Sequence, residues 1–147
     1  MFKHILLPTD GSKLSDRAVK LGIRFAGRMR ARVTALHVMP AFRTIADEGF
    51  APLSPALRRR LEDEARARAT KLLDAIARDA RSRKVRCVTL TVASDLAYQE
   101  IIGTARKKKC DLIMMASHGR RGLSSLLLGS ETAKVLLHSK VPVLVVR

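Results

Sequence analysis

Residues 111–147 read DLIMMASHGRRGLSSLLLGSETAKVLLHSKVPVLVVR, and the clearest sequence pattern of the chain lies here. It contains an apolar run, a glycine-bearing loop, an amphipathic segment that begins at Gly129 or Ser130, and a second apolar run. That order predicts a buried strand, a loop, a helix that ends near His138 and a closing strand. Backbone N–H groups at a helix N-terminus that is approached through glycines form an anion site. The stretch therefore predicts a loop that holds the phosphates of a nucleotide.

The rest of the chain alternates short apolar runs with helical patterns. Strands are predicted at 4–8, 32–38, 85–92, 111–116 and 141–146, with helices after Ser12, over 56–83, over 96–109 and from Gly129 or Ser130. Five strands separated by four helices are typical of an α/β fold, an open parallel sheet with helices on both faces. Pro142 places the last strand at or near an edge of the sheet, because proline cannot donate a ladder hydrogen bond.

Two local details of the helices are also predicted. In the first helix an apolar face recurs at spacings of three and four residues, formed by Leu14, Ala18, Leu21, Phe25 and Met29. Before the third helix, Ser94 and Asp95 are expected to act as N-terminal caps, because their side-chain oxygens can accept the first free N–H groups of a helix.

Length and composition limit what the chain can be. With 147 residues, 47% of them hydrophobic, we expect a single domain over residues 1–147 with a substantial core. No apolar run approaches the ~18 residues that span a bilayer, and the first residues lack the pattern of a signal peptide, so we expect a cytoplasmic protein. Cys87 and Cys110 are expected to be reduced, half-buried thiols.

The formal charge of +16 favours anionic partners. The basic residues are nevertheless spread along the helices, and only five aromatic residues are available for stacking on bases. No recognition-helix motif is present. We therefore interpret most of the charge as solvated helix faces, and we expect neither specific nucleic-acid binding nor a membrane partner.

Ligands of open parallel sheets bind beyond the carboxyl ends of the strands, where the strand order reverses. If the first strand lies beside the fourth, the loops after Pro8, Val38 and Ala116 converge on one crevice. Asp10 lies just past the first strand, where a carboxylate can accept ribose hydroxyl protons or help to hold a divalent cation. A helix cap or turn residue is an equal alternative for Asp10. Val38 ends the second strand, where free backbone groups can contact the edge of a base.

The glycine loop has a defined spacing. Gly119 and Gly129 are separated by nine residues, and Ser130 follows directly. The first glycine lets the backbone approach a ligand, the second relieves crowding at the helix start, and the Ser130 hydroxyl supplies a donor or a metal ligand. Arg120 and Arg121 can neutralise phosphate charge. The loop is not a Walker A motif, because the pattern GxxxxGK[ST] is absent.

The blocks ILLPTDGS, LHVMP, ASHGRRGLSSLLLGSETAKVLL and SKVPVLVVR resemble the universal stress protein family in order and spacing, over essentially the whole chain. The resemblance implies a Rossmann-like fold of the adenine nucleotide alpha hydrolase type with strand order 3-2-1-4-5. ATP-binding members of this family carry Gly-x2-Gly-x9-Gly-[Ser/Thr]. Gly119, Gly129 and Ser130 match this pattern, whereas Ala116 replaces its first glycine. Alanine keeps a backbone N–H contact if φ is negative there and is costly if the site needs a positive φ.

By the same resemblance, the ligand is ATP or another adenine nucleotide, accompanied by Mg²⁺. Its contacts would be Pro8, Thr9, Asp10 and Val38 for adenine and ribose, and Ala116, Gly119, Arg120, Gly129, Ser130, Glu131 and Thr132 around the phosphates. A nucleotide-bound Mg²⁺ would contact Asp10 and Ser130. Dimers of the family commonly pair the last strand across a two-fold axis. Here that strand runs from Val141 to Val146, an apolar segment that would otherwise be an exposed edge.

Three functions are compatible with this pattern. The first is a cytoplasmic stress-response protein that binds an adenine nucleotide and acts as a dimeric sensor or regulator; its hydrolysis would be slow at most, because no general base for water is visible. The second is a dimeric interaction module of the same fold without nucleotide, which Ala116 would favour. The third is a weak ATPase. His37 and His118 lie near strand ends without a carboxylate–histidine–nucleophile set, so we expect His118 to shape its loop by hydrogen bonding.

Overall fold

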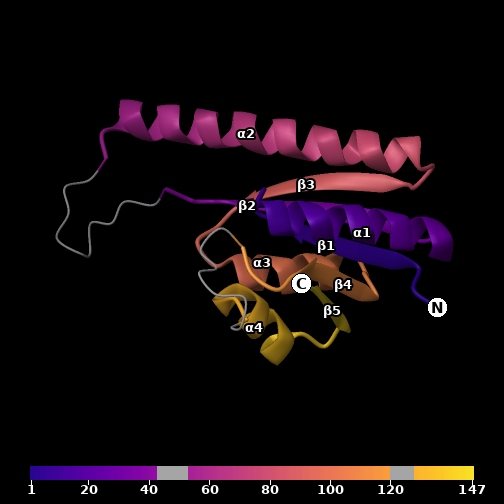
Figure 1. Ribbon diagram of the computed structural model, residues 1–147. Helices are drawn as coiled ribbons and strands as arrows, with labels where there is room; N and C mark the ends of the chain where they lie inside the picture. Colours follow the sequence, from indigo (N-terminus) through magenta and orange to yellow (C-terminus); the bar gives the residue numbers. More distant parts are fainter. Residues whose placement is uncertain (43–52, 120–127) are drawn as a thin grey trace.

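The computed structural model describes residues 1–42, 53–119 and 128–147, and its centre is a five-stranded sheet (Figure 1). All neighbouring strands are parallel, and their order β3-β2-β1-β4-β5 confirms the prediction. The last strand lies at an edge and begins directly after Pro142, as the proline indicated. The strands are β1 (His4–Thr9), β2 (Arg32–Met39), β3 (Cys87–Ala93), β4 (Leu112–Ala116) and β5 (Val143–Val146).

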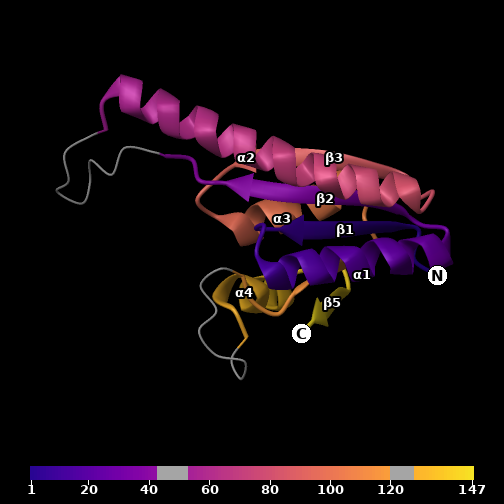
Figure 2. The same ribbon diagram turned by 45° about the horizontal axis from the view of Figure 1, so that its top comes forward.

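Four helices connect the strands and cover both faces of the sheet. They are α1 (Lys13–Met29), α2 (Pro55–Ser82), α3 (Ala97–Lys107) and α4 (Ser130–His138). One buried cluster lies between the sheet and α1 and α2, and a second lies between the sheet and α3 and α4. Figure 2 shows α1 and α2 in front of the strands. Among the described residues, no helix is long and apolar enough to cross a membrane.

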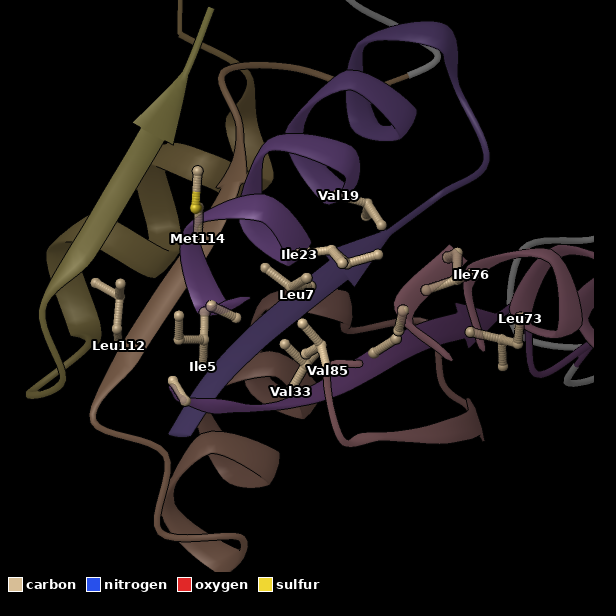
Figure 3. Packing of buried hydrophobic residues seen from close by; sticks show 14 residues of the cluster. Ile5, Leu7, Val19, Ile23, Val33, Leu73, Ile76, Val85, Leu112 and Met114 are labelled. Atoms are coloured by element: carbon tan, nitrogen blue, oxygen red, sulfur yellow. The ribbon is translucent and has the colours of Figure 1, made fainter. Parts of the chain in front are cut away.

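The central strand β1 is buried along its whole length, as parallel strands covered on both faces require. Because successive side chains alternate between the faces, Ile5 and Leu7 pack with Ile23 of α1 (Figure 3), whereas Leu6 packs with Ile113 on the opposite face. Burying each of these side chains stabilises the fold by about 1.5–3 kcal/mol. The central strand β1 therefore contributes to the hydrophobic cores on both faces of the sheet and joins its two halves.

The buried face of α1 differs from the predicted one. The prediction was Leu14, Ala18, Leu21, Phe25 and Met29, whereas the buried residues are Ser15, Ala18, Val19, Gly22, Ile23 and Ala26. The cause lies at Gly22, where a Cβ would come within 2.5 Å of Leu7 Cδ2. The helix backbone meets β1 along this glycine, so that Leu21 is turned outward and is 38% exposed. A count of apolar spacings misses such a contact, because glycine contributes no side chain to the count.

The first three helices end in the same way. One or two positions beyond the end of each helix, a residue adopts a positive φ: Arg30 at 52°, Lys84 at 57° and Lys109 at 54°. The next residue donates its N–H back into the helix: Ala31 to the Ala26 carbonyl at 2.9 Å, Val85 to Ala80 at 2.9 Å, and Cys110 to Ala105 at 2.8 Å. This is the Schellman motif, in which glycine ordinarily takes the left-handed position. Here a lysine or an arginine takes that position three times.

We predict that Lys84→Gly raises the free energy of unfolding by about 1 kcal/mol, because it removes the strain of a Cβ in the left-handed region. Arg81→Gly is the matched control. It removes the same charge three residues earlier, inside α2, where glycine should lower the free energy of unfolding by about 1 kcal/mol. Urea unfolding of both variants measures the difference. Destabilisation by Lys84→Gly would contradict the assignment.

His4 begins β1 and is buried, and its Nε2 lies 2.8 Å from the Thr34 hydroxyl oxygen. Burial lowers the pKa of His4 below its ordinary value of 6.5, and the Arg32 guanidinium lowers the pKa further. The folded protein therefore keeps this imidazole neutral at pH values where the unfolded chain already binds a proton.

We expect the contribution of His4 to stability to be fully present above pH 6.5 and to be lost as the pH falls from there to the folded-state pKa. Over this interval the unfolded state binds more protons, and one histidine contributes a slope of at most about 1.4 kcal/mol per pH unit. His4→Asn does not titrate, and its amide can still hydrogen-bond Thr34. Urea unfolding at about pH 7.5 and 5.5 should show a smaller pH effect in this variant. An equal pH effect in both proteins would contradict the prediction.

Candidate functional site

A cavity of about 450 Å³ opens at the carboxyl edge of the sheet, between the ends of β1, β2 and β4 and the first turns of α3 and α4. This volume lies within the range of small-molecule sites. Ten of the eleven predicted binding residues line the cavity, and the eleventh, Arg120, lies outside the described residues. The ten are Pro8, Thr9, Asp10, Val38, Ala116, Gly119, Gly129, Ser130, Glu131 and Thr132.

The turn after β1 places Asp10 in the cavity wall. Asp10 Oδ1 accepts the Ser12 N–H at 2.9 Å, and the Thr9 hydroxyl accepts the Gly11 N–H at 3.2 Å. Gly11 has a φ of 77°, a conformation that glycine adopts without strain. The cap of α1 is Ser12, whose hydroxyl accepts the Ser15 N–H at 3.2 Å. Asp10 is therefore a turn residue and not the helix cap, and the same residue also lines the cavity.

β2 extends farther than β1 at this edge. The β1–β2 register ends at Thr9 and His37, so Val38 and Met39 lie past the last paired residue of β1. The His37 ring Nδ1 lies 2.8 Å from the Thr9 carbonyl oxygen and links the two strand ends. Val38 is half-buried and lines the cavity. The end of β2 thus forms a wall of the cavity that β1 does not cover.

Gly119 and Gly129 allow two close approaches. A Cβ on Gly119 would collide with Oδ2 of Asp10. A Cβ on Gly129 would lie 2.9 Å from the His118 Cα and 3.1 Å from the Ser117 carbonyl oxygen, which accepts the Gly129 N–H at 2.8 Å. The φ of Gly129 is −61°, so this glycine supplies space and not a left-handed backbone. The two glycines bring the loop against Asp10 at one side and against the start of α4 at the other.

The first turn of α4 lines the cavity through Ser130, Glu131 and Thr132. The first N–H groups of a helix have no acceptor inside the helix, and the helix dipole makes this end positive. The N-cap residue, Gly129, has no side chain that could accept these protons. The arrangement therefore favours an anion in the cavity next to α4.

Glu131 has a second role, which the sequence did not indicate. Its Oε2 accepts the Tyr98 N–H at 2.8 Å, and its Oε1 lies 3.1 Å from Lys134 Nζ. Glu131 thereby caps α3 from a neighbouring helix, since α3 has no side-chain cap from its own N-cap residue. The prediction that Ser94 and Asp95 cap α3 is wrong, because the oxygens of both accept N–H groups outside the helix. This contact fixes the first turns of α3 and α4 on either side of the cavity.

Ala116 is the last residue of β4 and pairs with Val146 of β5. It does not belong to the residues with positive φ. Its carbonyl oxygen accepts the buried Thr132 hydroxyl at 3.0 Å. The backbone at this position is thus ordinary strand, and the methyl group of an alanine introduces no conformational strain.

Seven further residues line the cavity, and part of this set was predictable. Leu36 alternates with Val38 on β2, so the two share a face, and Asp95 follows β3 at the same edge. The α3 residues have no comparable signal, because their position depends on how α3 packs against α4. His118 also lines the cavity, and its Nδ1 lies 2.9 Å from the Ser117 hydroxyl. The seven are Ser15, Leu36, Asp95, Ala97, Ile101, Met115 and His118.

Within the described residues, no group of three or more histidine, cysteine, aspartate or glutamate side chains is arranged to hold a metal ion. A Mg²⁺ ion at Asp10 or Ser130 would take its remaining ligands from phosphate oxygens and water. That mode of binding is usual for Mg²⁺ in nucleotide sites.

Fold and cavity together define a class of protein. In the order β3-β2-β1-β4-β5, the chain leaves β1 in one direction toward β2 and later returns to its other side as β4. The cavity lies at the carboxyl ends of these strands, at the point of reversal. This is where doubly wound α/β proteins bind their ligands.

Comparisons with known proteins identify the family. The chain matches the universal stress protein family over residues 1–147. It is 34% identical to a universal stress protein of Methanocaldococcus jannaschii, over 100% of this chain and 83% of that one, and 33% identical to one of Thermus aquaticus over 100% of both. The solved structure of another M. jannaschii universal stress protein matches with a TM-score of 0.83 at 29% identity, covering 99% of this chain and 96% of that one. The chain belongs to the universal stress protein family.

More distant members with this fold have been solved with adenine nucleotides. One was solved in complex with cAMP, one from Arabidopsis thaliana with AMP bound, and one from Archaeoglobus fulgidus in complex with dAMP. They are 20%, 17% and 15% identical to this chain, with TM-scores of 0.72, 0.68 and 0.67. Each covers 98–100% of this chain, which covers 90–98% of them in return. Likeness at these identities shows the shared fold.

Proposed function

We propose that this protein binds an adenine nucleotide, in the first place ATP, in the cavity at the carboxyl edge, and acts as a cytoplasmic stress-response regulator. One observation carries the proposal: the first turn of α4 and the side chain of Asp10 line the same 450 Å³ cavity. An N-terminal helix turn suits phosphates, and a carboxylate suits ribose hydroxyls. A nucleotide is the common ligand that carries both groups.

The positions of the lining residues give the ligand an orientation. The base would lie toward Pro8 and Val38, where the wall is apolar and β2 extends beyond β1. The ribose would lie at Asp10. The phosphates would lie against the first N–H groups of α4, at Ser130 and Glu131, with a Mg²⁺ ion neutralising part of their charge. Adenine nucleotides in related folds support this ligand class.

Regulation fits the site better than rapid hydrolysis. A water molecule that attacks a phosphate needs a positioned base. Two carboxylates of the cavity accept backbone N–H groups, Asp95 from Ala41 at 3.1 Å and Glu131 from Tyr98 at 2.8 Å. Both carboxylates are thus engaged in holding backbone segments of the cavity wall in place. We therefore propose that a bound ATP is hydrolysed slowly at most.

The first test measures nucleotide affinity by isothermal calorimetry with ATP and Mg²⁺. Gly129→Val should lower the affinity at least tenfold, because its side chain would occupy the space against His118 at the start of α4. Gly103→Ala is the matched control. A Cβ at Gly103 meets nothing within 4 Å, so this variant should bind like the wild type. Thermal unfolding establishes that both variants fold.

Absence of heat with the wild type at millimolar ATP would overturn the proposal. Full affinity of a folded Gly129→Val variant would show that the phosphates lie elsewhere. Titrations with AMP and cAMP under the same conditions determine which adenine nucleotide binds best. A higher affinity for AMP than for ATP would assign the site to the monophosphate.

We further propose a homodimer formed by the C-terminal strand, from Val141 to Val146. β5 lies at the edge of the sheet, and its residue Leu144 is 36% exposed. An unprotected apolar edge promotes uncontrolled association, and pairing with a second copy across a two-fold axis removes that edge.

Leu144→Asp should convert the dimer to a monomer, because two carboxylates would face each other across the two-fold axis. Val88→Asp is the matched control. Val88 is 51% exposed on β3, the opposite edge strand, and the same change there should leave the dimer intact. Size-exclusion chromatography with light scattering measures the mass of each variant. A monomeric wild type, or a dimeric Leu144→Asp variant, would contradict the proposed interface.

A further inference from the structure

The end of the molecule opposite the cavity is strongly basic. Three segments lie there, 28–32, 81–86 and 106–109, and together they carry eleven of the 29 lysines and arginines. They contain the ends of α1, α2 and α3, and Figure 1 shows the ends of α1 and α2 on the same side as the N-terminus. All eleven basic side chains are exposed. We call this surface the amino-edge face.

The parallel sheet brings these segments together. The Arg32 N–H donates to the Lys3 carbonyl oxygen at 3.0 Å, and the Val33 N–H donates to the Arg86 carbonyl oxygen at 2.8 Å. Arg32 and Arg86 therefore lie side by side at the starts of β2 and β3, and Lys3 directly precedes His4, the β1 residue that pairs with Arg32. Neighbouring strands are about 4.8 Å apart, so Arg32 and Arg86 are closely spaced, and Lys3 lies at the same end of the sheet. Residues that are far apart in the sequence thus become one positive surface.

The residues that follow α1, α2 and α3 in the left-handed conformation are positively charged, although this backbone conformation favours glycine. Arg30, Lys84 and Lys109 hold the left-handed positions of three Schellman motifs, which glycine would occupy with less strain. A helix dipole favours cations near a C-terminus, but this effect is confined to the last turn and does not call for a cation at the strained position. At these three positions the sequence therefore has a positively charged residue where the backbone conformation would favour glycine.

Little acidic charge offsets the amino-edge face. In the three segments and the turns around them, the carboxylates are Asp79 and Asp111. Asp79 lies 3.0 Å from Arg83, and Asp111 accepts the Lys3 and His4 N–H groups at 2.7 and 3.0 Å. Among the ion pairs of the described residues, Arg83 alone of the eleven cations has an acidic partner.

The first half of α2 is a useful contrast, because it carries many arginines without forming such a surface. Arg58 pairs with Glu62 at 2.8 Å, and Arg60 pairs with Glu64 at 3.0 Å. In residues 55–68, three acidic side chains offset five arginines, which leaves a net charge of +2. The net positive charge of the chain is therefore concentrated at the amino-edge face and not distributed evenly over α2.

We propose that the amino-edge face binds the phosphate backbone of double-stranded nucleic acid without reading its sequence. Clustered lysines and arginines gain affinity from released counterions, and a duplex presents one negative charge per about 1.7 Å of its axis. Of the apolar residues in the segments and in the turns after them, Ala31, Val85 and Cys110 are buried, and Met29 is half-buried against the core. The face therefore lacks the fully exposed apolar side chains that anchor a protein in lipid. The face also exposes no aromatic platform on which single-stranded bases would stack.

The proposed surface is separate from the nucleotide cavity. The six residues of β1 connect the two ends of the sheet, and at about 3.3 Å per residue they hold them about 20 Å apart. Both ligands can therefore be bound at once. The inference does not depend on the proposed nucleotide function, and its failure would leave that function untouched.

The three left-handed positions provide the test. The triple variant Arg30→Gly, Lys84→Gly and Lys109→Gly removes three charges from the face and suits the backbone, so it should fold at least as well as the wild type. Fluorescence anisotropy with a labelled mixed-sequence DNA duplex of about 30 base pairs measures binding between about 50 and 200 mM salt. The wild type should show a steep loss of affinity with salt. The triple variant should bind at least about tenfold more weakly, with a salt slope reduced by up to about 2.7.

The control removes the same charge elsewhere. Arg17→Ala, Arg59→Ala and Arg66→Ala are exposed substitutions in the N-terminal halves of α1 and α2, and they should leave the salt slope unchanged. A second duplex of unrelated sequence should bind wild type within about twofold. No binding at the lowest salt, or equal losses in the two triple variants, would overturn the proposal. Binding to phosphatidylserine vesicles without binding to the duplex would also overturn it, in favour of a membrane surface.

Discussion

Parallel pairing of all five strands is the constraint on which both ends of this molecule depend. A chain that leaves one parallel strand must return to the other end of the sheet before it can form the next, and here a helix makes each return. Every helix therefore starts at the carboxyl edge and ends at the amino edge. The first turn of α4 and the cavity meet at one edge, and the basic ends of α1, α2 and α3 meet at the other. The central, fully buried β1 holds the two edges in a fixed relation.

Several features could be predicted from the sequence because their causes are local. Apolar runs of strand length, separated by helical segments, lead to a doubly wound sheet, and Pro142 marks the edge strand. Strand ends and the glycine spacing indicate Asp10, Val38, Gly119, Gly129 and Ser130, and the family resemblance added the other five predicted residues that line the cavity. The pattern left two roles open for Asp10, a ligand contact and a helix cap or turn residue, and only the structure shows that Ser12 provides the helix cap.

The features that could not be predicted depend on contacts between distant segments. The inward face of α1 is set by how closely Gly22 approaches Leu7, and a glycine carries no hydrophobic signal. The cap of α3 comes from Glu131, 33 residues after Tyr98, because two helices on the same face of the sheet place their first turns together. The amino-edge face arises in the same way. Its cations are dispersed along the sequence and become neighbours only when the helix ends are aligned by the sheet.

Ala116 stands where the family pattern has its first glycine, but this alanine is only weak evidence that the chain has lost nucleotide binding. At this position the fold needs a backbone that continues the ladder to Val146 and a carbonyl oxygen that accepts the Thr132 hydroxyl, and alanine provides both. The two remaining glycines cannot be replaced without a steric clash. A side chain on Gly119 would collide with Asp10, and one on Gly129 would collide with the backbone of His118. The shape of the cavity therefore depends on the two glycines that the chain retains and not on a glycine at position 116.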